Sequence, residues 1–80
     1  MHELSLAGEL VVQVGALAQR EGATRVVRIE LALGDLSGVD REALEFVFPL
    51  AAAGSVAEGA ALAVQEVSGS DLLIVAMEVE

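Results

Sequence analysis

Apolar residues in the first twenty positions recur every three or four residues, which is the period of an α-helix with one buried face. The apolar positions that define this face are Leu6, Leu10, Val14 and Leu17. A basic residue, Arg20, stands where the last turn would be, and Gly22 follows it, and both are signals that end a helix. The pattern predicts a helix over residues 3–20.

The period changes to two over residues 24–33, where apolar and polar side chains alternate. The apolar members of this alternation are Val27, Ile29, Leu31 and Leu33. Such alternation predicts a strand with one buried face. Residues 34–38 are rich in glycine and turn-forming residues, so a loop should follow, and Asp40 is a suitable N-cap for a second helix that ends near Gly54.

The second helix places four apolar residues on one face. They are Leu44, Val47, Phe48 and Ala51. We expect both phenylalanines, Phe46 and Phe48, to lie in or near the core. Pro49 lies beyond the first turn, so it removes a helical N–H bond and crowds the carbonyl group of Glu45. This predicts a kink or early fraying of the helix.

Two further apolar segments, residues 62–67 and 72–79, flank a short run of turn residues at 68–71 and predict a hairpin. The strand before the second helix and the strand after it should be parallel, because a helix joins them as a crossover. The expected fold class is α+β, in the order helix, strand, helix, strand, strand. It is a small three-stranded mixed sheet with two helices on one face, and residues 1–80 form one domain.

Length and composition indicate how many domains the chain forms and in which compartment it is found. Eighty residues are too few for two cores, although a hydrophobic content of 55% is ample for one. No apolar run approaches the roughly 20 residues of a membrane span, and Glu3 stands where a signal peptide would carry basic residues. We therefore expect a cytoplasmic protein without membrane association.

Charge and chemistry exclude several function classes. Thirteen acidic residues against four basic ones give a net charge of −9, which repels nucleic acid and favours cations or basic protein surfaces. The chain has no cysteine, hence no disulfide and no Cys-x-x-Cys zinc site. Its one histidine, His2, is terminal, and the chain has no thiol, so no nucleophilic triad is indicated, and no lysine serves a phosphate-binding loop. We expect that the protein is not an enzyme.

The segments MHELSLAGEL, RVVRIELALGDLSGVDREALEFVF, AAAGSVAEGAALAVQEV and AMEVE closely resemble the HypA/HybF family. Its members are nickel metallochaperones of nickel-iron hydrogenase maturation. The likeness covers nearly the whole chain, and the Met-His-Glu start combined with Gly-Asp-Leu-Ser-Gly is fairly specific. The resemblance implies a protein that carries Ni(II), with the GTPase HypB and the hydrogenase large subunit as partners.

One feature of that family is missing from this sequence. The resemblance implies a zinc ribbon, held by two Cys-x-x-Cys pairs and inserted before the last strand. Here residues 68–71 lead directly into that strand, so we expect a short turn in place of the ribbon and no bound zinc. The replacement fits either a natural loss or an engineered deletion. A shortened connection could also favour exchange of the last strand between two copies, giving a strand-swapped homodimer.

A histidine beside the amino terminus has three explanations: a remnant of a tag, an ordinary polar residue, or a metal ligand. Divalent nickel favours nitrogen-rich sites. The amine of Met1, the amide nitrogen and imidazole of His2, and the backbone nitrogen of Glu3 could form adjacent chelate rings around one ion. The resemblance implies the same ligands, Met1, His2 and Glu3, and suggests a lesser contribution from Asp40, whose role as a helix cap is already sufficient.

Two functions follow from these observations. The first is nickel delivery by a domain that retains the terminal site without the ribbon. The alternative is a metal-free protein-interaction or scaffold domain that has lost nickel transfer together with the ribbon. Titration with Ni(II) distinguishes them.

Overall fold

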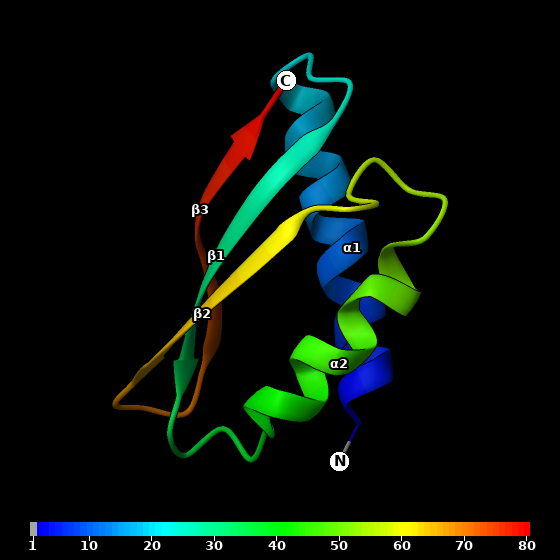
Figure 1. The fold of residues 1–80 in the computed structure, drawn as a ribbon. Coiled ribbons are helices and arrows are strands. Elements are labelled where there is room, and N and C mark those ends of the chain that lie inside the picture. The colour runs from blue at the N-terminus through cyan, green and yellow to red at the C-terminus, as the bar shows by residue number, and fades with distance from the viewer. Residues whose placement is uncertain (1) are drawn as a thin grey trace.

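The computed structural model describes residues 2–80 and contains two helices and three strands. In chain order these elements are α1 (Glu3–Arg20), β1 (Val26–Gly34), α2 (Arg41–Ala52), β2 (Ala61–Val67) and β3 (Leu72–Val79). Both helices lie on the same face of a mixed sheet, as Figure 1 shows. The expected α+β class and order of elements are confirmed.

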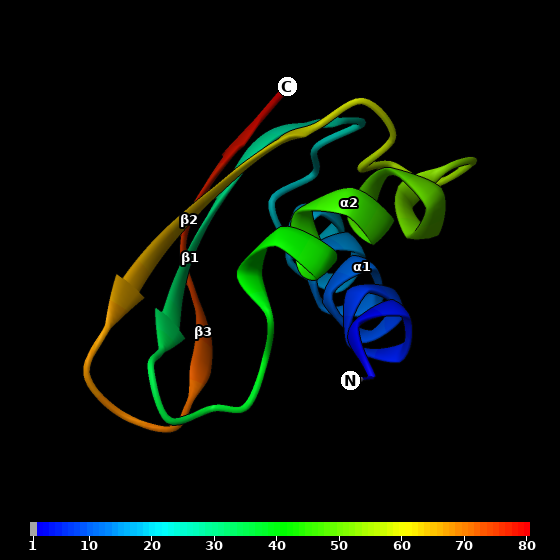
Figure 2. The same cartoon turned by 60° about the horizontal axis from the view of Figure 1, so that its bottom comes forward.

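The sheet has the strand order β2-β1-β3, with β1 parallel to β2 and antiparallel to β3. The parallel crossover through α2 is therefore confirmed. The predicted hairpin is wrong, because β2 and β3 do not pair with each other but occupy opposite edges (Figure 2). Since β1 fills the centre, the connection at residues 68–71 must cross the end of β1 to reach the far edge.

Backbone hydrogen bonds fix this crossing. The Gly34 N–H donates to the Asp71 carbonyl group, and the Leu36 N–H donates to the Gly69 carbonyl group, both at 2.8 Å. The crossing segment thus makes hydrogen bonds to the end of β1 and to the loop that follows. These bonds satisfy backbone groups that the end of a central strand would otherwise leave without partners.

The core lies between the helices and the inner face of the sheet. Its largest fully buried side chains are Val14, Val26, Ile29, Leu31, Leu44 and Phe48. Phe48 is a core residue as expected, but the expectation for Phe46 is wrong, since this side chain is 77% exposed. Two residues that are two positions apart on a helix point to different sides, so only one of the phenylalanines can face the sheet.

The second helix begins as expected, since Asp40 is its N-cap. It then continues through Pro49 as far as Ala52, so the expected early fraying does not occur. Of the two helices in the described part of the chain, neither is long and apolar enough to cross a membrane.

Replacement of Gly34 by alanine tests the crossing at the end of β1. A Cβ atom at Gly34 would lie 2.6 Å from the Gly69 carbonyl carbon and 2.9 Å from the Ser70 nitrogen, and both are backbone atoms that cannot rotate away. We expect Gly34→Ala to lower the free energy of unfolding in urea by about 1–3 kcal/mol. The control is Gly8→Ala in α1, where nothing lies within 4 Å of the added atom. Because alanine favours helix, this change should raise stability by up to about 1 kcal/mol, and equal effects of the two substitutions would contradict the prediction.

Candidate metal centre

His2 is the N-cap residue of α1 and lies at the surface. Its backbone angles, φ −111° and ψ 43°, are not helical, and its side chain makes no capping hydrogen bond. The Leu6 N–H donates to the His2 carbonyl group at 2.9 Å. The amide nitrogens of His2 and Glu3 precede this bond in the chain, so they lie outside the helical hydrogen-bond ladder.

Glu3 is the first residue of α1, and its side chain is buried, with only 7% exposed. The Glu3 carboxylate accepts a hydrogen bond from the Asp40 backbone N–H, with 3.0 Å between Oε2 and the nitrogen. A buried carboxylate is tolerated when it has such partners. The contact joins the beginning of α1 to the residue that caps α2.

Two hydrogen bonds are the main causes of a lowered pKa of the Glu3 carboxyl group. The hydrogen bond from the terminal ammonium group, followed by that from the Asp40 backbone, lowers the pKa of Glu3 to about 2. Burial acts in the opposite direction and is outweighed. Glu3 therefore carries its negative charge throughout the neutral and mildly acidic range.

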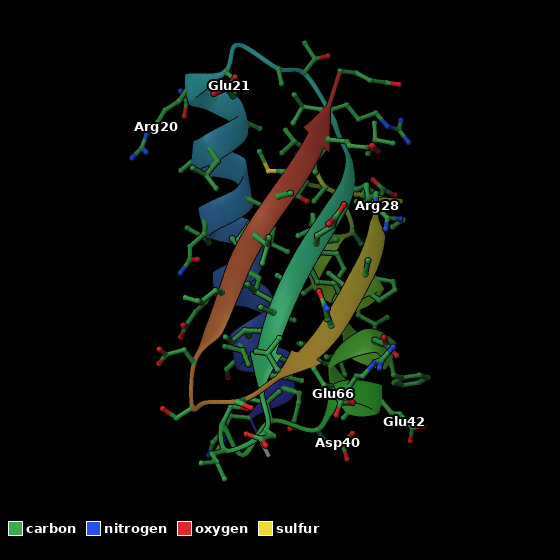
Figure 3. All side chains as sticks on the ribbon, turned by 90° about the vertical axis from the view of Figure 1, so that its left-hand side faces the viewer. Arg20, Glu21, Arg28, Asp40, Glu42 and Glu66 are labelled. Atoms are coloured by element: carbon green, nitrogen blue, oxygen red, sulfur yellow. The ribbon has the colours of Figure 1, made fainter. Side chains whose placement is uncertain are left out.

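The Asp40 side chain is already engaged, because its Oδ1 accepts from the Ala43 N–H at 3.0 Å. The structure thus brings Glu3 and Asp40 together through the backbone N–H of Asp40. The Asp40 carboxylate serves instead as the cap of α2. Figure 3 shows Asp40 at the same end of the molecule as Glu42 and Glu66.

An arginine offsets part of this acidic region. The guanidinium group of Arg41 lies 3.1 Å from the Glu45 carboxylate and 3.6 Å from that of Glu66. The contact with Glu45, and then that with Glu66, raises the pKa of Arg41 above its ordinary value. Arg41 thereby links α2 to the edge strand β2.

A hollow of about 250 Å³ lies beside the start of α1. It is lined by His2, Glu3, Ser5, Leu6, Glu9, Ser37, Gly38 and Val39. One water occupies about 30 Å³ in the liquid, so the hollow has space for a hydrated ion or for a side chain of another protein. Met1, the remaining predicted ligand, lies outside the residues that the structure describes.

Over residues 2–80, no three His, Cys, Asp or Glu side chains come together in a group that could hold a metal ion. A metal site at this end would therefore need backbone nitrogen atoms or the terminal amine as well as side chains. The contact of Glu3 with Asp40 was not predicted from the sequence. A signal for the burial of Glu3 was present, since it precedes Ala7, Leu10 and Val14 at helical spacing on the buried face of α1.

The lowered pKa of Glu3 predicts a pH-dependent contribution to stability in metal-free buffer. A group whose pKa is lowered by folding stabilises the protein above its unfolded-state pKa of about 4.5, and this contribution is lost as pH falls toward about 2. We expect wild type to be more stable than Glu3→Gln at pH 6, with a difference that shrinks between pH 4.5 and 2. Urea unfolding across this range measures it. Glu9→Gln removes one exposed charge from the same helix and is the control. A constant difference between wild type and Glu3→Gln would contradict the prediction.

Comparison with known proteins gives one consistent family. The family model described as "Hydrogenase/urease nickel incorporation, metallochaperone, hypA" matches residues 1–72. The hydrogenase maturation factor HypA of Chlorobium limicola is 48% identical over 68 residues, which are 85% of this chain and 59% of that protein. The corresponding protein of Roseiflexus sp. is 49% identical over 67 residues, which are 84% of this chain and 54% of that protein. The chain thus spans little more than half the length of these relatives.

Solved structures support the fold. The Ni metallochaperone HypA from Helicobacter pylori superposes with a TM-score of 0.78 at 20% identity, covering 95% of this chain and 72% of that one. A second solution structure, of a HypA protein, gives a TM-score of 0.80 at 16% identity, covering 100% and 97%. The family is one of metallochaperones and not of enzymes. By its sequence match over residues 1–72, the chain belongs to the HypA family of nickel-incorporation metallochaperones.

Proposed function

We propose that this chain holds one Ni(II) ion at its amino terminus and passes it on during maturation of nickel-iron hydrogenase. The ligands are the amine of Met1, the amide nitrogen and imidazole of His2, and the backbone nitrogen of Glu3. The observation that carries the proposal is the state of His2. It is an exposed N-cap residue without a capping hydrogen bond, at the start of a chain that belongs to the HypA family.

The chemistry of nickel supports this ligand set. Neighbouring nitrogen atoms along the backbone close small chelate rings, and Ni(II) accepts imidazole and other nitrogen ligands in planar or octahedral geometry. A metal-bound amide loses its proton, so binding should release protons and strengthen as pH rises. The amides of His2 and Glu3 precede the first hydrogen bond of α1, so their deprotonation leaves the helix intact.

The Glu3 side chain acts in this proposal as a positioning group and not as a ligand. Its carboxylate is occupied by the Asp40 N–H, which holds the first turn of α1 against the cap of α2. The terminal ammonium group, which lowers the pKa of Glu3, must lose a proton before the amine can bind nickel. A ligand set at a surface helix end can be approached by a receiving ligand, which suits an ion that must be released.

The further assignments follow from the same family membership. We infer that the short connection at residues 68–71 replaces the zinc ribbon, and that no zinc is bound. The partners would be the GTPase HypB and the hydrogenase large subunit, in the cytoplasm. A strand-swapped homodimer remains a prediction, which light scattering over a range of concentrations tests.

Calorimetric titration with Ni(II) tests the terminal site. We compare the native chain, His2→Ala, and a chain with one extra residue before Met1. The native chain should bind one ion. The other two should bind at least about tenfold more weakly, because each loses a nitrogen ligand or its chelate geometry. Bound nickel should also transfer rapidly to a competing chelator.

Two outcomes would contradict this proposal. Equal binding by all three chains would mean that the ion is held elsewhere. Absence of binding by all three would favour the metal-free interaction domain. Circular dichroism of each chain establishes that the fold is intact, so that loss of binding is not loss of structure.

The role of Asp40 requires a separate pair of variants. Asp40→Ala removes the acceptor of the Ala43 N–H and should lower stability by about 1 kcal/mol. Asp40→Asn keeps an acceptor oxygen but loses the charge, so we expect it to retain stability and to bind nickel within about twofold of wild type. Urea unfolding and calorimetry measure the two properties. A tenfold loss of nickel affinity in Asp40→Asn, with stability unchanged, would assign the carboxylate to the metal.

A further inference from the structure

We propose that the side of the helix layer turned away from the sheet is a docking surface for a basic amphipathic helix of another protein. This surface, here named the Phe46 surface, consists of Phe46 and Leu50 on α2 together with Leu4, Gly8 and Val12 on α1. It contains none of the ligands of the proposed nickel site, although Leu4 follows Glu3 directly in the chain, and the proposal does not depend on nickel binding.

The α2 half of the surface follows from helical geometry. Leu44, Phe48 and Ala52 are buried and define the side of α2 that faces the core. Phe46 and Leu50 are four residues apart, so they lie on one side of the helix, and they are 77% and 67% exposed. Neither side chain is needed to fill the core, which Phe48 completes from the opposite side of the helix.

The α1 half is also apolar and open. Leu4 is 58% exposed and Val12 is 72% exposed. Between them in the chain lies Gly8, and nothing stands within 4 Å of where its Cβ would be. Gly8 therefore adds no side chain between these two apolar residues, which stand about two helical turns apart.

The two halves belong to one layer. Figures 1 and 2 show α2 lying against α1, with the sheet on the other side of both helices. Val11 and Val47 are partly buried and pack against the core cluster, one from each helix. Isolated exposed apolar residues are ordinary, but four large ones on two packed helices are typical of a surface that binds another protein.

Charge indicates the chemistry of the occupant. Glu9, Glu42 and Glu45 lie on the same two helices. The one arginine of α2, Arg41, is engaged by Glu45 and Glu66. The two helices that carry the apolar residues therefore also carry acidic ones, on a chain of net charge −9. A partner helix with apolar residues on one face and lysine or arginine beside them complements both properties.

The same charges disfavour the two other candidate occupants. A second copy of this chain would bring two acidic surfaces together, each belonging to a molecule of charge −9. A bilayer with anionic lipid headgroups would also be repelled. A basic helix of a protein partner is therefore the occupant to which we commit.

The probe is a synthetic 18-residue peptide that forms an amphipathic helix with leucines on one face and lysines on the other. It is added to the full isotope-labelled chain without nickel, and amide chemical shifts are followed by NMR. We expect shift changes centred on Leu4, Gly8, Val12, Phe46 and Leu50. Phe46→Ser and Leu50→Ser should each weaken binding at least about tenfold. Val75→Ser, which removes another exposed apolar side chain from β3, should leave binding unchanged.

Two control peptides separate charge from apolar contact. One replaces every leucine by serine, and the other replaces every lysine by glutamate. Both should bind at least about tenfold more weakly than the probe. Equal binding by the lysine-serine peptide would overturn the proposal, because net charge alone would explain it. An equal loss with Val75→Ser, or self-association of the free chain through the Phe46 surface, would overturn it as well. Circular dichroism establishes that the variants are folded.

Discussion

The hydrogen bond between the Glu3 carboxylate and the Asp40 N–H joins the start of α1, where the proposed nickel site lies, to the start of α2. It places a buried charge where α1 begins, against the residue that caps α2. Because an ionised carboxylate is buried only at a large cost without partners, the packing of α2 on α1 must keep the Asp40 N–H within reach of Glu3. His2 precedes this fixed point directly in the chain.

The secondary structure could be predicted from the sequence because its causes are local. The helix at Glu3–Arg20 and the cap at Asp40 follow from periodicity and from one side chain. Strand pairing has no such local cause. Residues 62–67 and 72–79 have the composition of a hairpin, yet β1 takes the place between them because the parallel crossover brings β2 to one of its edges. Which edge the last strand occupies depends on the whole sheet.

The same distinction holds for the site. His2 as an exposed terminal residue and Asp40 as a cap were predictable, because each depends on immediate neighbours. The burial of Glu3 could have been predicted from its spacing to Ala7 on the inner face of α1. Its partner could not, because the Asp40 N–H lies 37 residues away and is brought near only by the packing of α2 on α1. Phe46 was misplaced for a related reason, since the sequence does not show which of two phenylalanines faces the sheet.

The proposed nickel site and the Phe46 surface are covalently adjacent, because Leu4 follows Glu3 in the first turn of α1. A partner docked on Leu4 and Phe46 would hold its own metal ligands near His2 at a high effective concentration. Weak docking would then suffice for transfer, since the second contact is intramolecular. The terminal site could keep its affinity for nickel in the free protein and still lose the ion in the complex, because the competing ligands become local only there.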